Sequence, residues 1–174
     1  MTTAPEAEQP GTQQRTRTFS WEDPMAGAAA AAGMSGAELF AAMTEGKIPA
    51  SPIGALLDFD GSEFGDGTAS FRLTPQEFHY NPIGTVHGGV FSTLLDSACG
   101  CAVHTKLPAG TFYTSLDLTV KFLRPVTIAT GPVTAHGTVT HFGRRTALAE
   151  ARLTDDDGKL YATATSSCLI MRPE

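Results

Sequence analysis

The stretch NPIGTVHGGVFSTLLD, residues 81–96, contains the start of the element around which this chain is predicted to fold. It begins as a loop, because Pro82 disfavours helical geometry in the residue before it. From Gly88 onward, apolar residues recur with helical spacing and predict one long helix that ends near His104. A single acid, Asp96, lies in that helix with no basic residue within a turn of it. A helix with so little charge is expected to be buried, so the aspartate is the residue to explain.

The composition fits one globular domain with a tail. Of 174 residues, 41% are hydrophobic and 17% are charged, the proportions of a chain that can bury a core. The formal net charge of −6 disfavours a nucleic-acid partner, which would need a basic surface. The N-terminus lacks the apolar segment of a signal peptide, and no run reaches the roughly 18 apolar residues of a membrane span. We therefore expect a cytoplasmic protein that binds neither nucleic acid nor membrane.

The cysteines and histidines do not suggest a metal site. The three cysteines lack C-x-x-C spacing and are interpreted as reduced thiols. The five histidines show no ligand spacing, and the sequence contains no G-x-S-x-G motif. A metalloenzyme and a serine hydrolase are therefore both disfavoured, and no cofactor is expected.

Three segments of the chain differ in composition. Residues 1–34 are predicted to be a disordered, low-complexity tail. Residues 35–52 are predicted to hold a short helix and a linker, with Ser35 as N-cap and Glu38 as its capping-box partner. This helix is expected to cover an end or an edge of the main domain, which comprises residues 53–174.

The main domain is predicted to be α+β. Alternating apolar and polar residues predict two strands before the long helix and four after it, at residues 55–64, 67–80, 112–123, 131–142, 146–154 and 159–171. No strand–helix alternation follows the central helix, which disfavours a doubly wound parallel sheet. The simplest packing is a mostly antiparallel sheet with the long helix on its concave face.

The entrance of the long helix offers a site for a carbonyl oxygen. The first N–H groups of a helix have no partners within it and carry the positive end of its dipole. Gly88 and Gly89 have no side chains, so a ligand can approach these groups closely. The motif therefore suggests a site for a carbonyl oxygen that becomes an oxyanion. The alternative is structural: the glycines permit tight packing and His87 caps the helix.

The position of Asp96 suggests that a site is shared between two subunits. A buried, unpaired carboxylate is costly unless it is hydrogen-bonded or used in chemistry. His87 and Asp96 are nine residues apart, which in a helix is about 13 Å along the axis and roughly half a turn around it. The two side chains of one chain could not share a reacting atom. Cooperation between them would require a homodimer with two shared sites.

The strand after the helix and the later cations supply further candidates. The Ser115 hydroxyl could orient a water molecule beside Asp96, whereas the neighbouring polar residues Asp117 and Thr119 are expected to form a solvated strand face. Cations occur late in the chain and are candidates for a phosphate-bearing ligand: Lys121, Arg124, Arg144 and Arg145. The alternative for each cation is a solvated turn residue.

Residues 81–96, followed by TSLDLTVKFLRP at 114–125, resemble the hotdog-fold acyl-CoA thioesterases of the phenylacetate-degradation (PaaI-type) group. The resemblance covers residues 53–171 and rests mainly on the pattern N-x₅-H-G-G-x₆-D. It implies an antiparallel sheet wrapped around one long helix. It also implies a homodimer formed through sheet edges, and in many relatives a tetramer.

The resemblance implies roles for individual residues. The Gly88 N–H, helped by the Asn81 amide, would polarise the thioester carbonyl. His87 would orient the site and contact the thiol side of the substrate. Asp96 of the other subunit would activate water or attack directly, and Ser115, or the adjacent Thr114, would position the water. The residues assigned to coenzyme A (CoA), which is part of the substrate, are Gly89, Thr114, Arg124, Arg144 and Arg145.

The expected activity is hydrolysis of an acyl-CoA thioester to a free carboxylic acid and CoA. One alternative is a non-catalytic hotdog protein that binds acyl-CoA, although Asp96 would then have no use. A hotdog enoyl-CoA hydratase is disfavoured, because its site holds an Asp and a His close together. In this chain the acid follows the histidine by nine residues.

Overall fold

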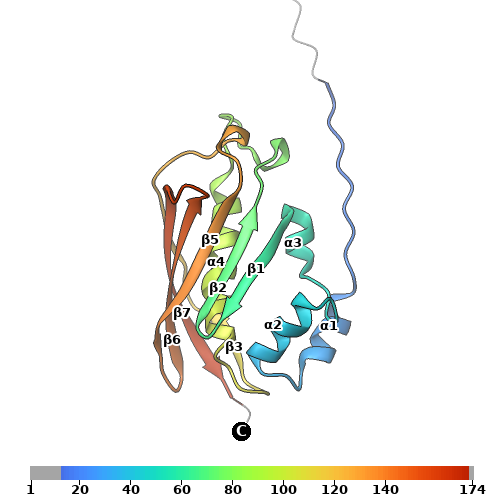
Figure 1. Ribbon diagram of the computed structural model, residues 1–174, viewed down its shortest axis with the longest axis vertical. Helices are drawn as coiled ribbons and strands as arrows, with labels where there is room; N and C mark the ends of the chain where they lie inside the picture. Colours follow the sequence, from blue (N-terminus) through green and yellow to red (C-terminus); the bar gives the residue numbers. More distant parts are fainter. Residues whose placement is uncertain (1–12, 173–174) are drawn as a thin grey trace, which may run out of the picture.

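Helix α4, Gly88–His104, lies in the concave face of a seven-stranded antiparallel sheet (Figure 1). The structure is a computed structural model that describes residues 13–172. The bounds of α4 are those predicted from the sequence. Its apolar face packs on the sheet through residues that are at most 7% exposed: Val90, Phe91, Leu94, Leu95, Ala98, Cys99, Ala102 and Val103. The predicted hotdog architecture, a sheet wrapped around one long helix, is confirmed.

The sheet has the strand order β1-β2-β5-β6-β7-β3, with β4 also paired to β7. All pairs are antiparallel. The strands are β1 (Phe59–Gly65), β2 (Thr68–Leu73), β3 (Phe112–Ser115), β4 (Thr119–Phe122), β5 (Val133–Phe142), β6 (Thr146–Asp155) and β7 (Leu160–Met171). Short 3₁₀ turns occur at Glu77–His79 and Ile128–Thr130. One edge of the sheet is β1, and the other is formed by β3 and β4, which follow one another along β7.

The prediction of one continuous strand at residues 112–123 is wrong at its centre. Residues 116–118 are not strand, although the Leu116 N–H still donates to the Ser167 carbonyl (2.8 Å), so the run is divided into β3 and β4. At the break, the Asp117 carboxylate accepts a hydrogen bond from the Ser167 N–H (3.1 Å), and the Asp117 carbonyl accepts one from Ser166 Oγ (2.7 Å). Asp117 therefore binds β7 and is not simply part of a solvated strand face.

Three short helices precede the sheet and gather beside β1 (Figure 1): α1 (Pro24–Ala31), α2 (Gly36–Thr44) and α3 (Pro52–Leu57). The capping box of α2 forms as predicted, because Ser35 Oγ accepts from the Glu38 N–H and the Glu38 carboxylate accepts from the Ser35 N–H. Helix α1 lies in the segment expected to be tail and buries no residue. Residues 1–12 of that predicted tail lie outside the described part of the chain.

Residues 55–57 were predicted as the start of a strand, and the structure corrects this. They form the end of α3, which begins at Pro52, a residue suited to the first turn of a helix. The helix stops at Asp58, which adopts a left-handed conformation with φ of 57°. Strand β1 then begins at the next residue. The local turn decided this boundary, and the apolar pattern of residues 55–57 did not distinguish helix from strand.

Small residues let α4 approach the sheet closely. In β6 the buried positions alternate with exposed ones and carry alanine three times, at Ala147, Ala149 and Ala151. In β5, Gly137 faces the backbone of α4, where an added Cβ would lie 2.2 Å from the Ala98 carbonyl oxygen. A side chain at this position would therefore push the helix and the sheet apart.

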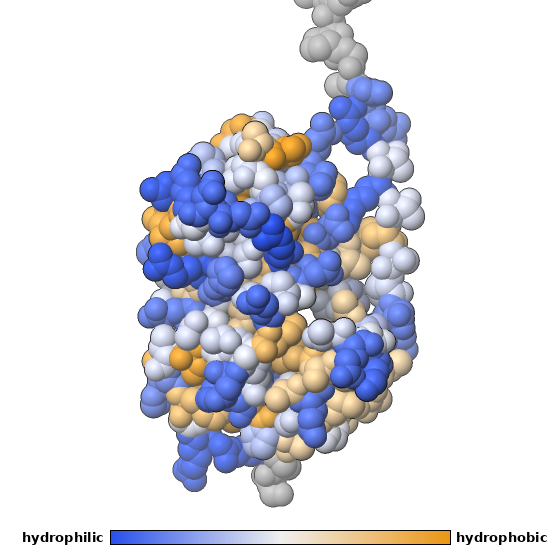
Figure 2. All heavy atoms as spheres, in the orientation of Figure 1, coloured by the Kyte–Doolittle hydropathy of each residue, from blue (hydrophilic) through white to orange (hydrophobic). Residues whose placement is uncertain are grey.

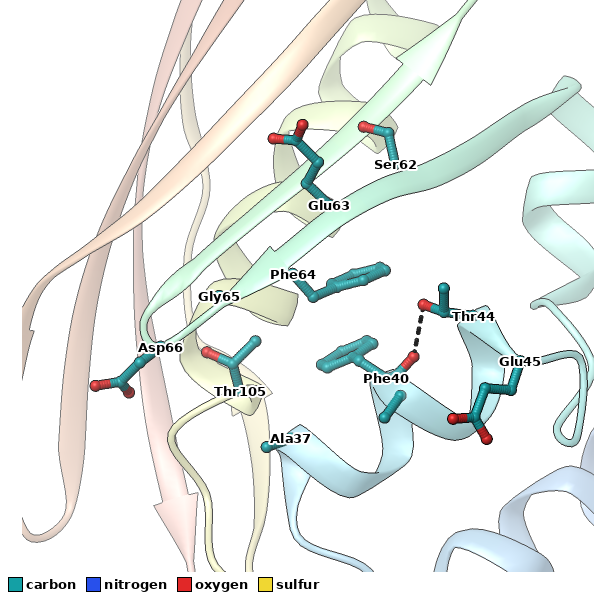
Figure 3. Close-up of a pocket in the computed structure, with 11 residues that line it drawn as sticks. Ala37, Phe40, Thr44, Glu45, Ser62, Glu63, Phe64, Gly65, Asp66 and Thr105 are labelled. Carbon is teal, nitrogen blue, oxygen red and sulfur yellow. Dashed lines mark hydrogen bonds between the residues drawn. The ribbon is translucent and has the colours of Figure 1, made fainter.

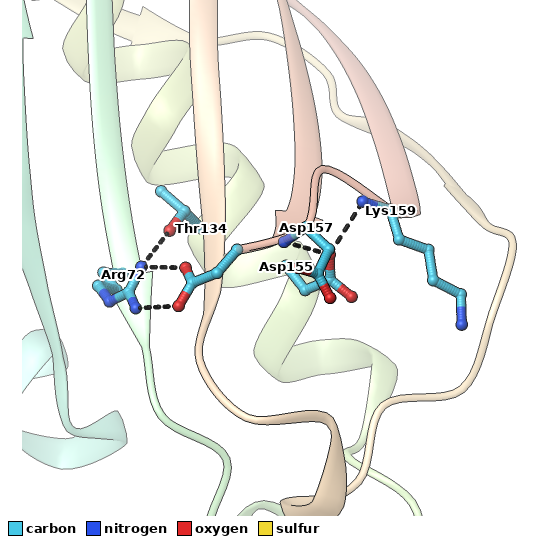
Figure 4. A network of polar contacts seen from close by, with 6 residues as sticks. Arg72, Thr134, Asp155, Asp157 and Lys159 are labelled. Carbon is cyan, nitrogen blue, oxygen red and sulfur yellow. Dashed lines mark hydrogen bonds and ion pairs between the residues drawn. The ribbon is translucent and has the colours of Figure 1, made fainter.

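A polar network ties β2 to the turn between β6 and β7 (Figure 4). The Arg72 guanidinium binds both carboxylate oxygens of Asp156, at 2.8 and 2.9 Å, and also donates to Thr134 Oγ1 on the intervening β5. Within the turn, Asp155 Oδ1 accepts from the N–H groups of Asp157 and Lys159. This turn carries the Asp-Gly signal of a tight hairpin.

In residues 13–172, no helix is long and apolar enough to cross a membrane.

We predict that Gly137→Ala destabilises the protein, because the new methyl group would collide with the Ala98 carbonyl. Overpacking of this kind costs about 1–3 kcal/mol of unfolding free energy. Urea denaturation would measure the loss. Thr138→Ala, at the adjacent exposed position, is the matched control and should change the midpoint little. Equal midpoints for wild type and Gly137→Ala would show that the helix–sheet contact is not tight.

Candidate active site

The loop before α4 is organised by Asn81. Its Oδ1 accepts hydrogen bonds from the backbone N–H groups of Ile83 (3.1 Å) and Thr85 (3.2 Å), and its Nδ2 donates to Thr85 Oγ1 (3.0 Å). An Asn side chain that binds its own following backbone is a common turn device. The amide therefore has a structural task that the sequence analysis did not assign to it. One of the two Nδ2 hydrogens remains for a ligand.

His79 supports this loop from beneath and was not singled out from the sequence. Its side chain is 2% exposed. Nδ1 accepts from the Gln76 N–H at 3.0 Å, so Nε2 carries the proton and donates to the Leu57 carbonyl at 2.7 Å. The His79 carbonyl accepts from the His87 N–H at 2.8 Å. Burial lowers the pKa of His79 below its ordinary value. A neutral imidazole thus anchors the entrance of α4.

His87 is the N-cap of α4, which was the structural alternative for this residue. Its Nδ1 accepts a hydrogen bond from the Gly89 N–H at 2.9 Å. The N–H of Gly88 has no acceptor among residues 13–172. The two glycines therefore differ: the Gly89 N–H is used in capping, whereas the Gly88 N–H remains available at the positive end of the helix.

Gly88 lines a cavity of about 370 Å³ at the start of α4. The cavity brings together three of the predicted site residues, Asn81, Gly88 and Arg124. The Phe122 ring covers Gly88 so closely that an added Cβ would lie 3.1 Å from it. The Arg124 side chain donates to the Leu160 carbonyl at 2.5 Å and contributes the one cation that lines this cavity.

Asp96 and Ser115 meet near the middle of α4. Ser115 Oγ donates to Asp96 Oδ1 at 3.3 Å, so the structure places these two residues together as the sequence analysis expected. Asp96 is half-buried in this single chain and forms no salt bridge among residues 13–172. Successive strand residues point to opposite faces, so Thr114 and Ser115 diverge. Ser115 is the one that contacts the carboxylate.

Asp96, Gly100 and His104 form a stripe along α4, and Tyr113 partly covers this stripe. An added Cβ at Gly100, one turn after Asp96, would lie 2.5 Å from the Tyr113 hydroxyl. Burial, together with the negative charge of Asp96, raises the pKa of both Cys99 and Cys101 to about 12. Burial also raises the pKa of Tyr113. These thiols and this phenol are therefore protonated at neutral pH and add no charge beside Asp96.

The two halves of the candidate site do not meet in one chain. Gly88 and Asp96 are eight residues apart on a continuous helix, which corresponds to about 12 Å along its axis. The predicted CoA residues are also separated. Arg124 contacts the Leu160 carbonyl at the start of β7, whereas the Arg145 carbonyl accepts from the Ile170 N–H near its end. Ten strand residues span roughly 33 Å. One chain therefore cannot use Arg124 and the Arg144–Arg145 turn on one small ligand.

The edge formed by β3 and β4 exposes large apolar side chains: Phe112 (55%), Leu116 (58%), Phe122 (56%) and Leu123 (50%). An uncovered apolar sheet edge is a site for association with another chain. Phe122 and Leu123 also line the cavity at Gly88. The exposed edge and the incomplete site are therefore adjacent.

In the described part of the chain, no group of three or more His, Cys, Asp or Glu residues is arranged to hold a metal ion.

An antiparallel sheet wrapped around one long helix is the hotdog fold. Residues 83–162 match the family model of the thioesterase superfamily. A candidate esterase of Pseudomonas aeruginosa is 30% identical over 62% of this chain and 73% of its own length. A candidate esterase of Halobacterium salinarum is 35% identical over 55% of this chain and 66% of its own length. The chain belongs to the thioesterase superfamily.

A solved structure supports the narrower resemblance to the phenylacetate-degradation group. It is a candidate thioesterase from Ralstonia eutropha that is described as related to phenylacetic acid degradation. It is 27% identical, with a TM-score of 0.68, over 75% of this chain and 98% of that one. The matched part of this chain corresponds to about two thirds of the two esterase relatives. Residues 1–82 lie outside the family-model match.

The buried, neutral state of His79 predicts a pH dependence of stability. Its pKa is lowered in the folded protein, so below about pH 6.5 the unfolded chain binds a proton that the folded chain does not. The unfolding free energy should therefore fall as the pH falls below 6.5, by at most about 1.4 kcal/mol per pH unit for this residue. Burial lowers the pKa of His104 as well, which adds to the effect.

Urea denaturation of wild type and His79→Gln between pH 7.5 and 5.5 would test this. Gln can replace the hydrogen bond to the Leu57 carbonyl and does not titrate. The variant should be less stable at pH 7.5 but should lose less stability on acidification. Equal losses in both proteins would contradict a neutral, buried His79.

Proposed function

We propose that the protein hydrolyses acyl-CoA thioesters at sites shared between the two subunits of a homodimer. One observation carries this proposal: Asp96 is half-buried and hydrogen-bonded to Ser115, on the helix that begins with the N–H of Gly88. Within the described part of the chain, Asp96 has no ion pair and the Gly88 N–H has no acceptor. Membership of the thioesterase superfamily supports hydrolysis as the reaction class. CoA would arrive as part of the substrate and leave as the free thiol, and the proposed reaction uses no further cofactor.

The carbonyl oxygen of the thioester would bind to the Gly88 N–H, with help from the second Nδ2 hydrogen of Asn81. As the tetrahedral intermediate forms, negative charge develops on this oxygen, at the positive end of the helix. The bound oxygen is thereby stabilised more in the transition state than in the ground state. His87 would hold the entrance in place through its cap to Gly89 and lie beside the sulfur of the leaving group.

Asp96 of the partner would act on the carbonyl carbon. As a general base it would take a proton from a water molecule held by Ser115, and the hydroxide formed would add to the carbon. Collapse of the intermediate breaks the carbon–sulfur bond, and the CoA thiolate takes up the proton. As a nucleophile, Asp96 would first form an anhydride with the acyl group, which breaks the carbon–sulfur bond and expels the CoA thiolate. Water would then cleave the anhydride to the free acid and the Asp96 carboxylate, and the thiolate would take up the proton released. Both routes use the same pair of residues.

A dimer through the β3–β4 edge would complete the site. The exposed side chains of this edge, including Phe112, Leu116 and Phe122, would be covered by the partner. Two antiparallel α4 helices would then place the Gly88 of one chain near the Asp96 of the other. Arg124 of one subunit and the Arg144–Arg145 turn of the other would be candidates for the CoA phosphates.

Asp96→Asn should lower kcat for acyl-CoA hydrolysis by about 10² or more, because the amide can neither accept the proton of water nor attack the carbon. Release of CoA from a panel of aryl and medium-chain acyl-CoAs would be measured with a thiol reagent. Asp157→Asn, an exposed acid in the β6–β7 turn, is the control and should keep wild-type activity. Wild-type turnover by Asp96→Asn would refute the role of Asp96. A wild type that binds acyl-CoA without hydrolysing it would identify a binding protein instead.

A complementation experiment tests whether the sites are shared. An Asn81/His87 double variant and an Asp96→Asn variant should each be inactive, whereas mixed dimers contain one intact site. After subunit exchange at equal concentrations, half of the dimers are mixed, so about a quarter of the wild-type activity should return. Native mass spectrometry would verify the exchange. Verified exchange without recovered activity would show that each site lies within one chain.

A further inference from the structure

A second cavity, of about 480 Å³, lies on the other side of α4 and takes no part in the chemistry described above. It is enclosed by α2 and α3 on one side and by β1, β2 and α4 on the other. Its walls are mainly apolar and aromatic: Leu39, Phe40, Met43, Phe59, Phe64 and Phe71. Apolar residues also gather on the surface over α2, whereas the upper part of this face is mainly hydrophilic (Figure 2).

The aromatic walls are held by contacts among themselves. The Phe40 and Phe64 rings stack at 4.2 Å between centroids, and Phe64 meets Phe71 edge to face at 5.8 Å. Figure 3 shows the stacked pair, with Phe40 coming from α2 and Phe64 from β1. Phe40 and Phe59 are only 4% and 5% exposed. The space beside these rings is therefore a formed apolar cavity and does not depend on a surface side chain moving aside.

The cavity adjoins the stripe of α4 that carries Asp96. Ser97, the next helix residue, lines it, and so do Cys101 and His104 farther along. Consecutive helix residues are 1.5 Å apart along the axis and rotated by 100° around it. An acyl chain whose carbonyl carbon lies at the Asp96 carboxylate therefore needs to pass only part of the way around the helix to enter this cavity. At the far end, the His104 ring meets both Phe40 and Tyr113 at 5.5 Å.

The charges around the cavity indicate which part of an acyl-CoA could bind in it. No Lys or Arg lines it, and Asp60 is its only acid. The phosphates of CoA would find no partner there, whereas an uncharged hydrocarbon would bury its surface. The neighbouring cavity of about 670 Å³, shown in Figure 3, is lined by three acids, Glu45, Glu63 and Asp66, which suit an apolar group less well. The shared Phe40–Phe64 pair stands between the two cavities.

We propose that this cavity binds the apolar end of a medium-chain aliphatic acyl group, and that α2 is the wall that sets its length. The proposal rests on acyl-CoA hydrolysis at Asp96. A volume of 480 Å³ falls within the range of small-molecule sites, and an acetyl or butyryl group would leave most of it empty. Each buried methylene should raise affinity about fourfold. Helix α2 is fixed to the domain by a hydrogen bond from the Gly36 N–H to the Leu107 carbonyl at 2.9 Å.

Two variants on α2 distinguish the cavities. Met43 lines only the proposed acyl cavity, and Met43→Trp would fill part of it. Ala41 lines only the neighbouring acidic cavity, and Ala41→Trp adds a side chain on the same helix as a matched control. The kcat/KM for butyryl-, hexanoyl- and decanoyl-CoA would be measured for each protein, with thermal unfolding to verify that each is folded.

We expect Met43→Trp to lower kcat/KM for decanoyl-CoA at least tenfold and to leave butyryl-CoA within about twofold of wild type. Ala41→Trp should leave both values within twofold. A uniform loss for all chain lengths, or no loss with Met43→Trp, would overturn the proposal while hydrolysis itself stands. A loss for decanoyl-CoA with Ala41→Trp alone would place the acyl chain in the acidic cavity and would also overturn it.

The affinity for decanoate, measured by isothermal titration calorimetry, separates this inference from the proposed reaction. Wild type and Ala41→Trp should bind decanoate, and Met43→Trp should bind it at least tenfold more weakly. This outcome would support the acyl cavity even if no acyl-CoA were hydrolysed, in which case only the proposed reaction fails. Equal affinities in all three proteins, or no binding by wild type, would refute the cavity as the acyl site.

Discussion

The close contact between α4 and the inner face of the sheet is the constraint on which the rest of the structure depends. At Gly137 the helix backbone approaches so near that a methyl group would not fit. On the neighbouring strand β6, the buried side chains at positions 147, 149 and 151 are alanines, which also leave room for the helix. The sheet can therefore curve around the helix and bury its apolar face over the whole length. The residues that the helix carries at its entrance and at its middle are then kept at a fixed separation, because neither end can move without opening the core.

That fixed separation explains why the candidate site is incomplete in one chain. The N–H of Gly88, which has no acceptor among residues 13–172, and the carboxylate of Asp96 are separated by about two turns of helix. Bending the helix would break the core contacts, so a second copy of the chain is the less costly way to bring the two groups together. The apolar edge of β3 and β4 provides the surface for such a copy, and two of its exposed residues, Phe122 and Leu123, also line the cavity at Gly88.

The N-terminal helices extend the same framework to specificity. Residues 36–57 are not needed to close the sheet, yet α2 and α3 enclose an apolar space against β1 and the face of α4 next to Asp96. Asp96 thus has the proposed thioester site on one side and a mainly apolar cavity on the other. A scaffold whose chemistry depends on backbone groups and one acid can change its substrate by altering such an added wall, without disturbing the reacting groups.

The sequence by itself determined the elements whose causes are local. The helical spacing of apolar residues defined both ends of α4, and the Ser35–Glu38 pair defined the start of α2. The spacing from His87 to Asp96 predicted that these two side chains of one chain lie apart. Only the tertiary structure decided what depends on distant partners. It assigned Asn81 to its own turn, buried His79 under the loop, laid Tyr113 over Gly100, and separated Arg124 from Arg144 and Arg145 along β7. Residues 55–57 form a short apolar run that fits helix and strand equally well, and the local turn at Asp58 made them the end of a helix.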